Sequence, residues 1–136
     1  GGVIRGDATD MLVAFAESLD APVFTTTNGR GAIPEDHPLC AGTFLMQCQE
    51  AISDADVVIA VGTRFQGGAT GNFSLNLPGK LVHLDADPHM ISLNYPADVA
   101  LVGSAHHGLS ALAEFNVEPG DAQFLSRVQT AAGRLP

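Results

Sequence analysis

The longest apolar runs in this chain have the length and composition of buried β-strands. Residues 56–61 (Asp-Val-Val-Ile-Ala-Val) and 80–85 (Lys-Leu-Val-His-Leu-Asp) are nearly continuous in apolar side chains. Such runs are typical of parallel strands that are covered on both faces. Shorter β-rich stretches at 22–26 and 98–102 predict two further strands.

Between these stretches, apolar residues recur at helical spacing and predict four helices. The first covers 11–19 with Asp7 as its N-cap, the second covers about 45–54, and the third covers about 104–115. The last apolar stripe runs over 124–135. In the third helix, the residues expected to face inward are Leu109, Leu112 and Ala113.

Strands that alternate with helices predict right-handed crossovers and a parallel sheet. We therefore expect an α/β fold, a Rossmann-like parallel sheet with helices on both faces in three layers. The segments 27–41 and 62–79 are rich in turn residues and are expected to be loops. Glu-Pro-Gly-Asp at 118–121 interrupts the pattern, which predicts one domain over 1–117 and a helical extension or linker over 118–136.

Charge excludes several classes of partner. The 136 residues include only six Lys and Arg and carry a net charge of −9, so phosphate backbones and anionic membranes would be repelled. No apolar run reaches the roughly 18 residues that span a bilayer. Cys40 and Cys48 allow one disulfide, but buried free thiols in a cytoplasmic protein fit their apolar neighbours better.

Polar and glycine-rich segments follow the predicted strands, where ligands bind in open parallel sheets. Gly1-Gly2 before a helix would let amides approach a phosphate, or would simply make a tight turn. Arg64 in Gly62-Thr-Arg-Phe65 offers a planar fork for phosphate, or is a plain surface arginine. Asp85 can accept from ribose hydroxyls, whereas Asp87-Pro88 is better explained as the start of a helix.

The histidines give little support to a metal or catalytic centre. His106 and His107 are adjacent on a predicted helix and point about 100° apart, so a solvated face is the simpler interpretation. His83 lies inside a strand, which indicates a packed core histidine. Asp36-His37 lies in a proline-rich loop and is explained by turn formation. No catalytic triad or carboxylate pair can be argued from spacing.

Three motifs in order resemble one family. They are residues 21–38 (APVFTTTNGRGAIPEDHP), 55–65 (ADVVIAVGTRF) and 81–88 (LVHLDADP), continued by 94–99 (NYPADV) and Gly103. Together they are similar to the central domain of thiamine-diphosphate-dependent enzymes such as acetolactate synthase and benzoylformate decarboxylase. The resemblance extends over nearly 1–115.

The resemblance implies a six-stranded parallel sheet with a strand before Gly1, which this chain lacks. It also implies that thiamine diphosphate and Mg are bound by two other domains of a homodimeric or homotetrameric parent enzyme. The activating glutamate and the G-D-G motif of those domains do not occur in this sequence. We therefore expect a fragment of a decarboxylase, lyase or acetolactate-synthase-like transferase that has no catalytic and no metal-binding residue of its own and is inactive alone.

The resemblance also implies where a nucleotide, FAD or ADP, would lie in this domain. Three departures from the FAD-binding pattern argue against FAD: Leu45 replaces a glycine, while Gln66 and Ser104 replace aspartates. The candidate cofactor-binding residues are Gly1, Gly2, Thr26, Thr27, Asn28, Gly62, Arg64, Phe65 and Asp85.

Two other functions stay open at this point. The first is a stand-alone nucleotide-binding module or partner subunit, which would need a complete sheet. The second is a nicotinamide-dependent oxidoreductase domain, which would need a G-x-G-x-x-G fingerprint that the sequence does not contain.

Overall fold

The computed structural model describes residues 1–43, 48–65, 70, 73–115 and 118–133. In these residues the strands are β1 (Val23–Phe24), β2 (Cys40–Gly42), β3 (Val57–Val61), β4 (Lys80–Asp85) and β5 (Val99–Val102). The helices are α1 (Gly2–Arg5), α2 (Thr9–Leu19), α3 (Gln49–Ile52), α4 (Ala105–Ala113) and α5 (Ala122–Ala131), with a 3-10 turn η1 at Thr27–Gly29. The four predicted strands are confirmed.

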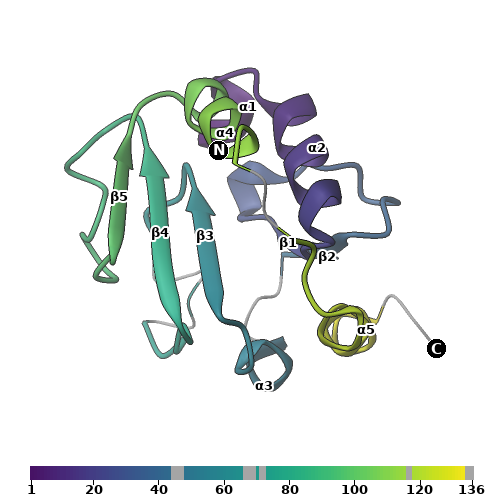
Figure 1. Cartoon of the computed structure of the whole chain (residues 1–136). Helices are drawn as coiled ribbons and strands as arrows, with labels where there is room; N and C mark the ends of the chain where they lie inside the picture. Colours follow the sequence, from purple (N-terminus) through teal and green to yellow (C-terminus); the bar gives the residue numbers. More distant parts are fainter. Residues whose placement is uncertain (44–47, 66–69, 71–72, 116–117, 134–136) are drawn as a thin grey trace.

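All strand pairs are parallel, and they form two sheets (Figure 1). The larger sheet has the order β3-β4-β5, and the smaller one pairs β1 with β2. Among the described residues, no strand joins β1 to β3, so each has an open edge.

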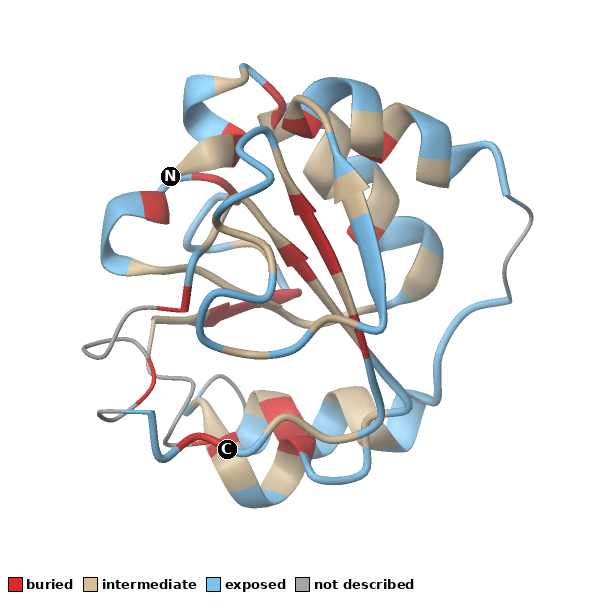
Figure 2. Cartoon of the chain, turned by 90° about the vertical axis from the view of Figure 1, so that its left-hand side faces the viewer, coloured by how far each residue is buried: buried red, intermediate tan, exposed pale blue. Residues whose placement is uncertain are grey.

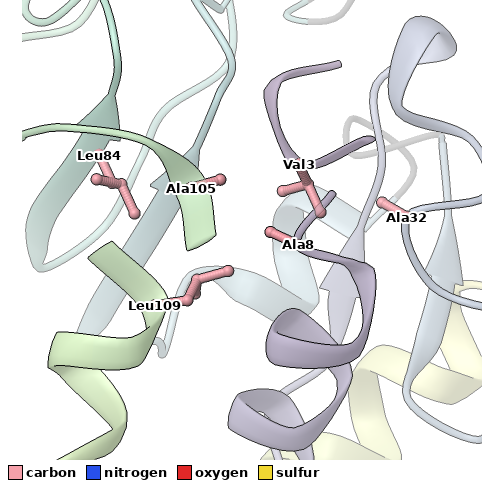
Figure 3. Close-up of a cluster of buried hydrophobic side chains, with 6 residues drawn as sticks. All are labelled: Val3, Ala8, Ala32, Leu84, Ala105 and Leu109. Carbon is pink, nitrogen blue, oxygen red and sulfur yellow. The ribbon is translucent and has the colours of Figure 1, made fainter. Parts of the chain in front are cut away.

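Helices cover both faces of the strands, and Figure 2 shows one group on each side. Leu84 of β4 packs on one face against Val3, Ala8, Ala105 and Leu109 of the α1, α2 and α4 region (Figure 3). On the other face, α3 and α5 share a core that includes Ala41, Cys48, Ile52, Leu75 and Val128. The three-layer α/β/α arrangement predicted from the sequence is therefore confirmed.

Two glycines permit the chain to turn or to pack closely where a side chain would not fit. Gly79 has a φ of +63°, and a Cβ there would lie 2.1 Å from the carbonyl oxygen of Asp56. Gly108 brings α4 onto β4, because a Cβ there would lie 2.4 Å from Leu84 Cδ2. Gly79 thus lets the start of β4 approach the start of β3, and Gly108 lets α4 pack closely on β4.

Several predictions at the level of single elements were wrong. Residues 40–42 form β2 within the predicted loop, and Ala8 rather than Asp7 precedes α2, since Asp7 has a φ of +50°. Asp87-Pro88 starts no helix: the Asp87 carboxylate accepts from the His89 amide at 2.9 Å, and the chain continues in turns. Ala113 is exposed rather than inward.

The C-terminal helix α5 packs on the same unit. Its Val128 is fully buried, and Arg127 Nη2 lies 3.1 Å from Asp54 Oδ2 just after α3. The apolar stripe predicted over 124–135 therefore belongs to a helix, α5, that packs against α3. The predicted boundary at residue 117, which lies outside the described residues, stays a prediction.

Both cysteines are buried thiols, as predicted, and they form no disulfide with each other. Burial raises the pKa of the Cys48 thiol, which keeps it in the unreactive protonated form at neutral pH. Among the helices that the structure describes, none is long and apolar enough to cross a membrane.

Candidate functional site

The candidate site is built around a backbone crossing between Gly2 and Gly62. The amide of Gly2 donates to the carbonyl oxygen of Gly62 at 3.3 Å, immediately after β3 ends. A Cβ on Gly62 would lie 2.6 Å from the Cα of Gly2, and one on Gly2 would lie 2.7 Å from the Cα of Gly62. Real Cβ atoms do not approach so closely, so both positions require glycine.

This geometry gives Gly2 and Gly62 a packing role, while the phosphate-binding role considered for Gly1-Gly2 stays a prediction. Gly62 has a φ of +64°, a conformation that glycine adopts without strain. The contact of α1 with the end of β3 occupies the amide of Gly2. The crossing therefore brings the N-terminal segment to the carboxyl end of the sheet, where a ligand site would lie.

The turn after β1 reaches the same place from the other side. Thr26 precedes the 3-10 turn of Thr27, Asn28 and Gly29. A Cβ on Gly1 would lie 3.8 Å from the Asn28 Cβ, and one on Gly29 would lie 3.3 Å from the Gly1 nitrogen. Gly29 is a member of this arrangement that was not among the candidate residues, although it lies in the segment 27–41 that was expected to be a loop.

Asp85 ends β4 on the third side of the crossing. The Gly62 amide donates to the carbonyl oxygen of Leu84 at 2.9 Å, immediately before Asp85 in the chain. This bond brings the end of β4, and with it Asp85, to the crossing. One Asp85 oxygen accepts from the Asp87 amide at 2.9 Å, which orients the carboxylate.

The turn at Gly62–Phe65 adjoins the crossing, and it places one side chain in solvent and another in the core. Arg64 is exposed at the carboxyl end of the sheet. Phe65 is 7% exposed, and its ring packs on His83 at a centroid distance of 5.5 Å and on Tyr95 at 5.1 Å. Any contact from Phe65 to a ligand would therefore come from its backbone, and its assignment as a cofactor-binding residue stays a prediction.

The structure thus brings Gly1, Gly2, Asn28, Gly62 and Asp85 together, with Arg64 on the adjoining turn. Leu45 and Gln66, on which two arguments against FAD depend, lie outside the described residues. Ser104 has a structural role: its hydroxyl caps α4 by accepting from the His107 amide at 3.1 Å.

Nothing in the described part of the chain forms a metal centre. No group of three His, Cys, Asp or Glu side chains there could hold an ion. His106 and His107 are exposed and contact each other edge to face, with ring centroids 5.8 Å apart. The described residues therefore offer no such side-chain cluster for the Mg ion that accompanies thiamine diphosphate in the resembling enzymes.

Comparison with known proteins agrees with this architecture. The family model of the thiamine pyrophosphate enzyme central domain matches residues 1–112. An acetolactate synthase large subunit of Parasynechococcus marenigrum is 35% identical over 145 aligned positions, which cover 100% of this chain and 24% of the relative. A glyoxylate carboligase of Escherichia coli O157:H7 is 34% identical over 142 positions, which cover 100% of this chain and 22% of the relative.

A solved structure of a thiamin diphosphate-dependent enzyme from Mycobacterium smegmatis has a TM-score of 0.67 and 34% identity. The match covers 88% of this chain and 24% of that one. This chain therefore spans about a quarter of the length of these relatives. On this evidence, the chain belongs to the family of thiamine pyrophosphate enzyme central domains.

Proposed function

We propose that this chain is the central domain of a thiamine-diphosphate-dependent enzyme acting on 2-keto acids, as a decarboxylase, lyase or acetolactate-synthase-like transferase. In this role it carries no catalytic group of its own and connects the cofactor-binding domains of a homo-oligomeric parent. The match to the family over residues 1–112 carries the proposal. The names of its relatives, which include a synthase and a carboligase, support the reaction class.

We further propose that a nucleoside diphosphate such as ADP would bind around the Gly2–Gly62 crossing, at the carboxyl ends of the strands. Arg64 would face the pyrophosphate, and Asp85 would accept from the ribose hydroxyls. The supporting observation is that Gly1, Asn28 and the end of β4 at Leu84 and Asp85 meet at one backbone crossing, at the carboxyl ends of the strands. We favour ADP over FAD because Leu45 replaces the glycine that the resemblance to FAD-binding enzymes implies at this position.

We expect the purified chain to show no turnover of pyruvate or benzoylformate when thiamine diphosphate and Mg²⁺ are added. The reason is that the glutamate and G-D-G motifs of the resembling enzymes are absent from this sequence. The measurement is consumption of the 2-keto acid over hours at high protein concentration. Turnover above a heat-denatured control would contradict the proposal that the domain is not catalytic alone.

Replacing Arg64 with Ala should weaken ADP binding by roughly ten- to over a hundredfold, since a charge-assisted hydrogen bond contributes roughly 1.5–3 kcal/mol. Isothermal titration of both proteins with ADP measures the change. Arg127→Ala is the matched control, because Arg127 pairs with Asp54 beside α3, on the opposite side of the domain. Equal ADP affinity in wild type and Arg64→Ala would reject this placement of the pyrophosphate.

A further inference from the structure

The backbone of the turn that carries Arg64 is held from outside by side chains of two other segments. His83 of β4 is 1% exposed, and its Nε2 lies 2.6 Å from the carbonyl oxygen of Thr63. A carbonyl oxygen can only accept, so His83 Nε2 must carry the hydrogen. The other ring nitrogen, Nδ1, is buried and has no hydrogen-bond partner among the described residues.

Asn94 holds the next two carbonyl groups of the same turn. Its Nδ2 donates to the carbonyl oxygen of Arg64 at 2.7 Å and to that of Phe65 at 3.2 Å. Asn94 lies in a loop that is closed by a hydrogen bond of 2.9 Å from the Ala97 amide to Ser92 Oγ. Three consecutive carbonyl groups are therefore bound by two side chains that lie 20 to 30 residues away in sequence.

The turn needs such support because its conformation is unfavourable for its residues. Phe65 has a φ of +54°, a region that bulky residues rarely adopt. Its ring is fixed between His83 and Tyr95, and its amide donates to Thr63 Oγ1 at 3.2 Å. Strained backbone of this kind persists where the surroundings determine it, and it occurs often at ligand sites.

We propose that His83 and Asn94 are positioning residues of the candidate site. They fix the backbone at residues 63–65 in one conformation and thereby set the direction in which Arg64 leaves the sheet. Only the consequence for ligand affinity rests on the proposed nucleotide site, because the effect on the turn is a property of the chain alone.

The role of Asn94 is tested by the substitution Asn94→Asp. This change keeps the shape of the side chain, removes the Nδ2 donor and places a carboxylate against two carbonyl oxygens. We expect amide exchange at Phe65 to become roughly tenfold faster, as its bond to Thr63 Oγ1 loses support. Asn76→Asp is the matched control: it adds the same charge at an exposed position whose side chain makes no hydrogen bond within the described residues. Equal Phe65 exchange in the two variants would overturn the role of Asn94.

The role of His83 can be tested first on the wild-type chain. A long-range ¹H–¹⁵N spectrum of the folded wild-type chain should show His83 with hydrogen on Nε2 and none on Nδ1. The opposite tautomer would overturn the role of His83. His83→Gln, which keeps an N–H donor at similar reach, should preserve slow Phe65 exchange, whereas His83→Leu should not.

Titration with ADP separates this inference from the proposed function. If both hold, Asn94→Asp should weaken ADP binding several-fold while Asn76→Asp binds as the wild type does. If Phe65 exchange responds as expected but neither wild type nor variants bind ADP, the positioning role stands and the nucleotide site is wrong. If ADP binds and Asn94→Asp leaves both exchange and affinity unchanged, the positioning role is wrong and the site stands.

Discussion

Replacing Gly62 with Ala should lower the free energy of unfolding by about 3 kcal/mol. A residue with a side chain pays about 1–2 kcal/mol to adopt the left-handed conformation that Gly62 has, with its φ of +64°. The added Cβ would also lie 2.6 Å from the Cα of Gly2, so backbone must move, and overpacking of this kind costs about 1–3 kcal/mol. Urea denaturation of the variant and the wild type measures the loss.

Gly79→Ala is the matched control for Gly62→Ala. Gly79 has a φ of +63°, and its added Cβ would lie 2.1 Å from the Asp56 carbonyl oxygen, so its stability loss should be at least as large. It precedes β4, at the opposite end of the sheet from the candidate site. Under conditions where both variants are folded, only Gly62→Ala should weaken ADP binding. A stable Gly62→Ala protein would show that the crossing is looser than the structure indicates.

Replacing Leu109 with Ala should cost about 3 kcal/mol, within the range of about 2–5 kcal/mol for buried leucines. Leu109 is fully buried, and it joins α4 to Leu84 of β4 and to the residues Val3 and Ala8 near α2 (Figure 3). Removing its isobutyl group leaves a cavity between the helical layer and the sheet. The change is measured from the midpoint of urea unfolding at an unchanged slope.

Leu93→Ala makes the same chemical change at a position that is 56% exposed, and it should cost less than about 0.5 kcal/mol. A similar loss in both variants would mean that Leu109 is not part of a packed core. A loss at Leu109 alone would confirm that α4 covers the sheet as the structure shows.

The sequence predicted those strands whose own residues form a long apolar run. β3 and β4 lie within continuous apolar runs, which are typical of parallel strands, and the structure pairs these two strands in parallel. By contrast, β2 covers only Cys40–Gly42 after a proline-rich stretch, and it exists because it pairs with β1. Three residues carry too little periodicity for prediction, so this strand depends on a tertiary partner that the local sequence does not show.

The helix expected after Asp87-Pro88 shows the opposite error. An aspartate before proline is a good helix start in isolation. Here the Asp87 carboxylate instead accepts from the His89 amide and ring, which lowers the pKa of Asp87, and the chain turns toward Asn94. The hydrogen bonds of Asn94 to the Arg64 turn require that path, and they span 30 residues that no local pattern connects.

The candidate site was predictable in outline and not in detail. Gly62, Arg64 and Asp85 were identified because strand ends of a parallel sheet meet at one edge. The Gly2–Gly62 contact and the carbonyl bonds of His83 and Asn94 were not, since they depend on how distant segments approach one another. His83 was correctly predicted as a core residue, but its link to Thr63 could be seen only in the fold.

The most direct test of the account is a ¹H–¹⁵N titration of the labelled chain with ADP, followed by FAD. The account predicts that ADP shifts the amides of Gly2, Asn28, Arg64 and Asp85 together, and that FAD binds no more tightly than ADP. Shifts confined to a surface that contains none of these residues, or stoichiometric binding of FAD, would contradict it.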